Sequence, residues 1–125
     1  MAGVQAQLQG LSEEYQKIQT ELQTTVQSRQ QLEAQRQENL GVQEEFNKLK
    51  DGERIYKLVG PVLLQQDKIE AESTVQGRIE FINKEIDRQE ASIKDCQAKL
   101  DKKKTEIIQL QTSAQAAAGP SQAQA

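Results

Sequence analysis

The feature that most constrains the fold is a pair of apolar stripes at heptad spacing, one in each half of the chain. The first stripe consists of Leu8, Leu11, Tyr15, Ile18, Leu22 and Thr25. The second consists of Val75, Ile79, Ile82, Ile86, Gln89, Ile93, Cys96, Leu100, Lys103, Ile107 and Leu110. Alternating steps of three and four residues place such side chains along one narrow side of a helix. Both halves are therefore predicted to be long coiled-coil helices that meet along this seam.

The two stripes match each other when the chain folds back at its middle. In this antiparallel register Leu8 faces Leu110 and Leu22 faces Cys96, and each such pair lies symmetrically about Val59. Two separate stripes thus agree on one fold-back point, which favours helices that pair within one chain. The alternative, in which each stripe pairs with a second molecule, stays open on these observations.

The first stripe contains one irregularity. From Leu32 onward its apolar residues fall out of step, and the stripe is predicted to continue through Gln35, Asn39, Val42, Phe46 and Leu49. Such a change corresponds to a skip of three residues, which alters the local winding of a coiled coil. The symmetrical register therefore applies to the parts of the helices away from the middle of the chain.

Local signals divide the chain into four segments. Asp51 and Gly52 are expected to end the first helix, because glycine readily adopts the left-handed conformation found after a helix C-terminus. Asp67, with Glu70 three residues later, is typical of the start of a helix. The predicted segments are an N-terminal helix over 1–51, a β-hairpin over 52–66, a C-terminal helix over 67–112 and a tail over 113–125. The tail is expected to be disordered, because its small polar residues cannot bury a face.

The longest apolar run lies between the two helices, at 55-IYKLVGPVLLQQ-66. β-Branched and aromatic residues around Gly60 and Pro61 predict two strands and a turn. A lone two-stranded hairpin is marginal in water and leaves two unpaired edges, so it is expected to join hairpins of other subunits. The predicted contact residues are Ile55, Tyr56, Leu58, Val59, Gly60, Pro61, Val62, Leu63 and Leu64.

The predicted fold class is mainly α: a long antiparallel two-helix coiled coil joined by a short β-hairpin, which pools into a β-barrel shared with other subunits. An alternative is a structural coiled-coil adaptor that dimerises through the hairpin. A plain connector is disfavoured, because connections between packed helices usually have two to eight polar residues. The barrel predicts a closed complex, and the adaptor predicts a dimer.

Residue content argues against catalysis. The chain of 125 residues contains no histidine, one cysteine and no phosphate-binding glycine loop. No catalytic residue, cofactor or metal site is therefore expected, and the protein is interpreted as a non-enzyme. Cys96 falls on the second stripe and is interpreted as a small buried apolar residue.

Charge and hydropathy exclude two further classes of partner. The 16 basic and 19 acidic residues are interleaved, and the one basic run, Lys102 to Lys104, is interpreted as a solvated helix face. No nucleic-acid partner is expected. No apolar stretch is long enough for a membrane span, and the first ten residues lack the apolar core of a signal peptide. A cytoplasmic protein without a membrane partner is expected.

The central sequence IYKLVGPVLLQQD, followed by EAESTV, RIEFI and the long heptad stripe, resembles the β-type subunits of the eukaryotic prefoldin family. The resemblance spans about residues 5–112. It implies a subunit of a six-membered complex in which the hairpins of α- and β-type prefoldin subunits form a double β-barrel with six protruding arms. One hairpin's worth of β residues fits the β type.

The same resemblance implies a function and its partners. Prefoldins hold unfolded proteins without ATP, and the eukaryotic members deliver the clients actin and tubulin to the cytosolic chaperonin. The family grips clients at the ends of its arms. In this chain the residues at that position are Val4, Leu8, Leu11, Ile107, Ile108 and Leu110. Ile108 lies beside the stripe and is expected to be exposed.

Overall fold

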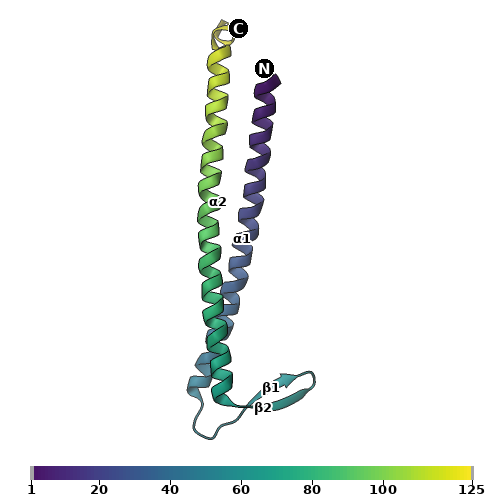
Figure 1. The fold of residues 1–125 in the computed structure, drawn as a ribbon, viewed down its shortest axis with the longest axis vertical. Coiled ribbons are helices and arrows are strands. Elements are labelled where there is room, and N and C mark those ends of the chain that lie inside the picture. The colour runs from purple at the N-terminus through teal and green to yellow at the C-terminus, as the bar shows by residue number, and fades with distance from the viewer. Residues whose placement is uncertain (1, 125) are drawn as a thin grey trace. The chain divides into compact units, whose positions relative to one another are not determined.

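The computed structural model describes residues 2–124, with the side chains of residues 2–117, and contains two long helices joined by a hairpin (Figure 1). In chain order the elements are α1 (Ala2–Lys48), β1 (Ile55–Val59), β2 (Val62–Gln66) and α2 (Lys68–Gln124). The helices run antiparallel, so the predicted mainly α fold with a central two-stranded hairpin is confirmed.

The chain forms two compact units. The first comprises α1 up to Gln27 and α2 from Glu90, and it contains both chain ends (Figure 1). Cys96 is buried in its seam, with 3% of its surface exposed, and the neighbouring seam residues are half-buried. Lys103 reaches across from α2 to Glu14, with 2.5 Å between Nζ and Oε2. This contact agrees within one residue with the symmetrical register about Val59.

The second unit comprises residues 28–89 and includes the hairpin. Its core comes from one side of α2, where 4–7% of each side chain is exposed at Ala71, Val75, Ile79, Ile82 and Ile86. The facing part of α1 supplies half-buried side chains only. Gln43 Nε2 donates a hydrogen bond of 2.5 Å to Gln76 Oε1 across the helix pair. The predicted fold-back within one chain therefore holds in this unit too.

The predicted skip in the first stripe is wrong. Gln35 and Val42, which the skip places on the seam, are exposed, whereas Arg36 and Gln43 are half-buried there. The steps of three and four therefore continue unbroken to the end of α1. The prediction missed these positions because it followed the apolar residues Val42 and Leu49. Long polar side chains such as those of Arg36 and Gln43 can also cover a seam, with their aliphatic stems. Arg36 keeps its charge paired, with Nη2 2.6 Å from Glu33 Oε1.

The segment that joins α1 to α2 follows the sequence signals at its α2 end but departs from them at its α1 end. α1 ends at Lys48, earlier than predicted, and Gly52 with φ 87° is the third residue of a following turn. The backbone N–H of Glu53 closes that turn on the Lys50 carbonyl at 3.1 Å. Asp67 caps α2 as predicted, since its Oδ2 accepts a 3.3 Å hydrogen bond from the backbone N–H of Glu70.

The C-terminal end of α2 also differs from the prediction. The helix continues to Gln124, where the sequence analysis expects it to end at residue 112 before a disordered tail. Loss of the heptad pattern marks the end of the seam, and the alanine and glutamine residues over 114–118 favour continuation of the helix beyond it. Ala114 is the last half-buried position among the described side chains.

The seam predicts a sharp contrast between two adjacent residues of α2. Ile82 is 6% exposed and Phe81 is 63% exposed. Replacing Ile82 by alanine should lower the free energy of unfolding by about 2–5 kcal/mol, because it leaves a cavity in the seam. Phe81→Ala should change it by less than about 0.5 kcal/mol. Urea unfolding followed by circular dichroism measures both, and equal losses would contradict the seam.

Candidate functional site

The hairpin is built around a tight turn at Gly60 and Pro61. Val59 pairs with Val62 across this turn, followed by Leu58 with Leu63 and Tyr56 with Gln65. Gly60 has φ 58°, a conformation that glycine adopts without strain. Proline keeps a negative φ at the next position, so the turn matches type II′, whose twist suits a two-residue hairpin. The sequence predicts both strands and this turn correctly.

Both faces of the hairpin carry exposed apolar side chains. Paired residues on antiparallel strands share a face, so Tyr56, Leu58 and Leu63 lie on one side. The other side carries Val59, Val62 and Leu64, together with Ile55 and Lys57. The exposed fractions reach 69% at Leu58 and 62% at Leu63. A sheet that is apolar on both faces needs cover from outside the chain.

The hairpin also presents two open edges. The sheet contains only β1 and β2 among residues 2–124, so neither outer edge is paired within the described chain. Only Ile55 and Gln66, at the end next to the helices, are half-buried. Figure 1 shows the two strands extending away from the helices. Unpaired N–H and C=O groups on such an edge can accept a strand from another chain.

The predicted arm-tip residues lie in the first unit, at the end where both chain ends are found (Figure 1). Five of them are half-buried along the seam, namely Val4, Leu8, Leu11, Ile107 and Leu110. Ile108 is 50% exposed, as its place beside the stripe predicts. The predicted hairpin residues belong to the second unit.

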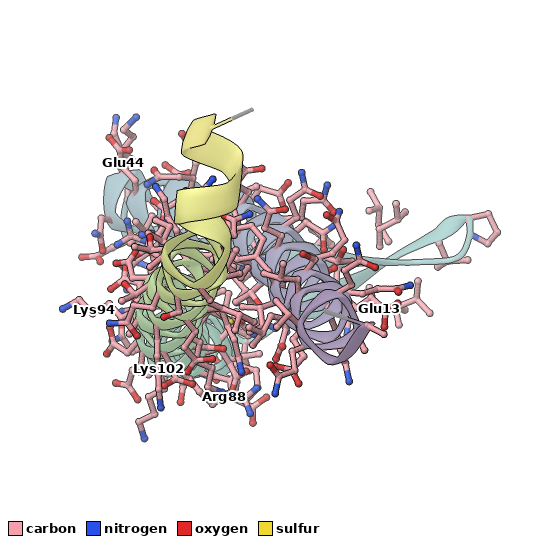
Figure 2. The ribbon with its side chains drawn as sticks, turned by 90° about the horizontal axis from the view of Figure 1, so that it is seen from above. Glu13, Glu44, Arg88, Lys94 and Lys102 are labelled. Atoms are coloured by element: carbon pink, nitrogen blue, oxygen red, sulfur yellow. The ribbon has the colours of Figure 1, made fainter. Side chains whose placement is uncertain are left out.

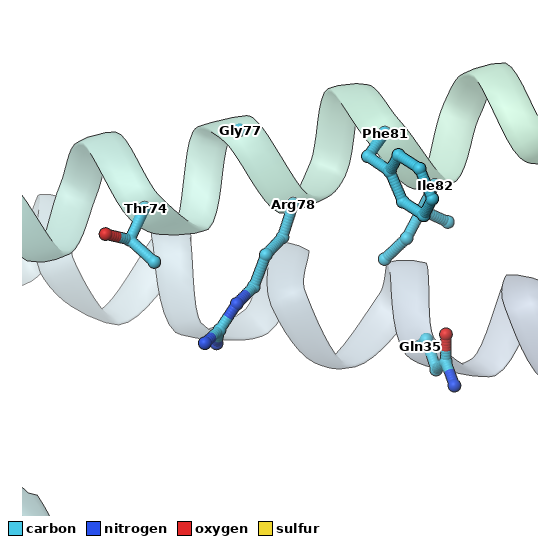
Figure 3. A pocket seen from close by; sticks show the side chains of 6 residues that line it. All are labelled: Gln35, Thr74, Gly77, Arg78, Phe81 and Ile82. Carbon is cyan, nitrogen blue, oxygen red and sulfur yellow. The ribbon is translucent and has the colours of Figure 1, made fainter.

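Two large apolar side chains on α2 that the sequence patterns do not single out are exposed. Ile69 is 76% exposed in the first turn, and Phe81 is 63% exposed farther along the helix. The available signal is that both residues fall outside the heptad stripe. Phe81 lies beside an open hollow lined by Gln35, Thr74, Gly77, Arg78 and Ile82 (Figure 3). The residues that line this hollow include no pair of acid and base groups.

The remaining polar side chains form no reactive cluster. Within residues 2–117, no three of the His, Cys, Asp and Glu side chains gather to hold a metal ion. Charged groups such as Glu44, Arg88 and Lys94 point away from the helices (Figure 2). Several pair along their own helix, as Lys99 does with Asp95 at 3.1 Å. Such exposed pairs contribute little to stability.

None of the described helices combines the length and apolar content required to cross a membrane.

Lys103 places a charge in the seam of the first unit. Its Nζ lies 2.5 Å from Glu14 Oε2 and 3.5 Å from Glu106 Oε2. The hydrogen bond to Glu14 is the main reason that the pKa of Lys103 lies above its ordinary value, so the amine stays protonated. Lys103 faces α1 as predicted, with its charge held by carboxylates from both helices. A polar layer of this kind fixes the register of a coiled coil.

Cys96 has the surroundings of a structural residue. Burial is the main reason that the pKa of its thiol lies above the ordinary value, and the Glu21 carboxylate raises that pKa further. Lys99 acts in the opposite direction. The thiolate, which is the reactive form, is therefore scarce at neutral pH.

Cys96 should react slowly with a thiol reagent while the chain is folded. At pH 7.5 we expect iodoacetamide to label the native protein at least about ten times more slowly than the urea-unfolded protein, because both burial and the raised pKa suppress the thiolate. Mass spectrometry of timed samples measures the rates. Equal rates would show that the seam opens freely at Cys96.

The fold defines a class of protein: two long antiparallel coiled-coil helices joined by a β-hairpin whose apolar faces are exposed. The family model described as "Prefoldin subunit" matches residues 9–114. Prefoldin subunit 6 of Saccharomyces cerevisiae is 44% identical over 88% of this chain and 96% of its own length. The mouse prefoldin subunit 6 is 39% identical over 96% of this chain and 97% of its own.

A solved structure gives the same result. The prefoldin beta subunit from Thermococcus strain KS-1 superposes with a TM-score of 0.75, at 25% identity, over 81% of this chain and 89% of its own. The chain belongs to the prefoldin family, and within it is similar to β-type subunits of the subunit 6 kind. It is therefore a non-enzymatic subunit of a chaperone complex that assembles with other prefoldin subunits.

Proposed function

We propose that the hairpin is the assembly element of this subunit and contributes two strands to a β-barrel shared by six α- and β-type prefoldin subunits. The observation that carries the proposal is the exposure of Leu58 and Leu63 on one face and of Val62 and Leu64 on the other. Neighbouring hairpins would pair with both open edges, and closure of the barrel removes those edges. The two faces would be covered by the barrel interior and by adjoining subunits.

The complex holds unfolded proteins such as actin and tubulin without ATP and passes them to the cytosolic chaperonin, which places the protein in the cytoplasm. Family membership supports this role. The lack of a phosphate-binding loop in the sequence agrees with a mechanism that uses no nucleotide. Binding would then depend on apolar contact with exposed segments of the client.

Clients are held at the ends of the arms, in the first unit. Ile108 is half-exposed there, and Val4, Leu8, Leu11, Ile107 and Leu110 lie beside it with part of each surface open. Helix ends fray, and fraying would expose more of these side chains. A partly open apolar seam suits unfolded segments, which expose apolar residues without a fixed shape. Several weak contacts from six arms would add up to firm holding.

Charges in the hairpin should prevent assembly. We expect Leu58→Asp combined with Leu63→Asp to leave the subunit outside the complex, because the paired carboxylates cannot be buried in a barrel. Native mass spectrometry after co-expression with the other prefoldin subunits measures incorporation. Val42→Asp, at an exposed site on α1, is the matched control and should assemble normally. A homodimer of the unmodified chain in place of a hexamer would favour the adaptor interpretation.

Polar substitutions at the arm tips should weaken client holding while the complex stays intact. With Val4→Ser and Ile108→Ser together, we expect about five times more complex to be needed for the same suppression of actin aggregation, since two apolar contacts are lost. Light scattering after dilution of denatured actin measures this. Gln109→Ser, at an exposed polar neighbour, is the control. Unchanged suppression by the double variant would contradict client binding at these tips.

A further inference from the structure

A second exposed apolar feature lies in the second unit, at the start of α2. Ile69 is 76% exposed, the largest exposed fraction among the large apolar side chains noted above. It borders a hollow between the beginning of α2 and the end of α1. The lining residues are Gln43, Phe46, Asn47, Ile69, Glu72, Ser73 and Gln76. Phe46, one of these lining residues, is half-buried. We call this surface the base hollow.

Packing within the chain does not account for Ile69. The residue lies outside the heptad stripe, and β-branched isoleucine is a weaker helix former than the polar residues common on exposed helix faces. Its side chain gains little from burial in the isolated subunit. Ile69 instead lies three residues beyond the exposed apolar hairpin, so it can extend that apolar surface, and contiguous apolar surfaces of this kind are typical of contact sites.

The base hollow has the composition of a small interface. Its two apolar lining residues, Ile69 and Phe46, are accompanied by amide and hydroxyl side chains. Two of these amides, Gln43 and Gln76, already share a hydrogen bond. The only charged lining residue, Glu72, pairs with Lys68 at 3.7 Å. Two apolar residues beside paired amides and a paired carboxylate suit a folded, largely uncharged protein surface.

The base hollow is continuous with the proposed assembly element. β2 ends at Gln66, and only the capping residue Asp67 separates it from α2. Ile69 therefore lies three residues beyond the strand. A strand added to the outer edge of β2 would run about 4.8 Å away, so one of its ends would lie next to the start of α2.

From this continuity we propose that the base hollow is a second subunit contact. Its occupant is the neighbouring prefoldin subunit whose strand pairs with the outer edge of β2, and the contact is made by the segment that joins this strand to its helix. The inference rests on the proposed barrel. It adds that subunit contact extends beyond the strands onto the first turn of α2, and that this contact helps to select the neighbour on that edge.

A photo-crosslinking amino acid at position 69 tests the identity of the occupant. In the complete complex we expect crosslinks from position 69 to one other prefoldin subunit, within the segment next to its strand. The same group at position 81, which is also exposed on α2, should give no crosslink to a subunit. Crosslinks from position 69 only to added denatured actin or to the chaperonin would overturn the proposal.

Substitution of Ile69 tests whether the contact contributes to assembly. We expect Ile69→Ser to speed loss of this subunit from the complex about 10-fold, because a buried apolar side chain is lost from the contact. Subunit exchange against an isotope-labelled chain, followed by native mass spectrometry, measures the rate. Phe81→Ser is the control and should exchange at the rate of the unmodified chain. An unchanged rate for Ile69→Ser would also overturn the proposal.

Two failures can be distinguished with the hairpin variant as reference. If the Leu58→Asp and Leu63→Asp chain cannot assemble while position 69 gives no subunit crosslink and no faster exchange, the base hollow is not a contact and the barrel proposal stands. If the hairpin variant assembles normally, the barrel proposal fails. The proposal that the base hollow is a subunit contact rests on the barrel, so it is overturned as well.

Discussion

The narrow seam between α1 and α2 is the constraint on which the rest of the structure depends. In the second unit α2 buries Ala71, Val75, Ile79, Ile82 and Ile86, while none of the side chains of α1 is fully buried. Burial is thus one-sided, because a regular row of apolar side chains on α2 packs against a surface of α1 that mixes polar and apolar side chains. Because helix stability in proteins comes mainly from such packing, both long helices require this contact.

The seam uses most of the large apolar side chains and leaves the hairpin uncovered. A chain with 35% hydrophobic residues can line one contact between two helices, but it cannot also provide a layer over β1 and β2. Both faces and both edges of the hairpin therefore stay uncovered within the described chain. Family membership and this exposure lead to the same interpretation, in which an incomplete sheet becomes complete only in an assembly.

Sequence patterns predicted those features that depend on spacing or on local backbone chemistry. The stripe on α2, the turn at Gly60, the cap at Asp67 and the exposure of Ile108 were all accessible in this way. The errors have a common cause. The prediction shifted the stripe of α1 to include the apolar residues Val42 and Leu49, and so moved it away from Arg36 and Gln43, whose long side chains cover the seam with their stems. It also treated the end of the heptad pattern as the end of the helix.

By itself the sequence determined the two helices, the register about Val59 that an antiparallel pair would adopt, the central hairpin and the absence of residues for catalysis, because periodicity and turn chemistry are local properties of the chain. The tertiary structure decided that the helices pair within one chain. The tertiary structure decided which side chains remain exposed once the helices meet. Ile69 and Phe81 are as apolar as their neighbours in the seam, and only the position of the facing helix leaves them open. The heptad pattern places both residues outside the seam, but how far each is exposed depends on what covers it, which spacing along one chain does not give.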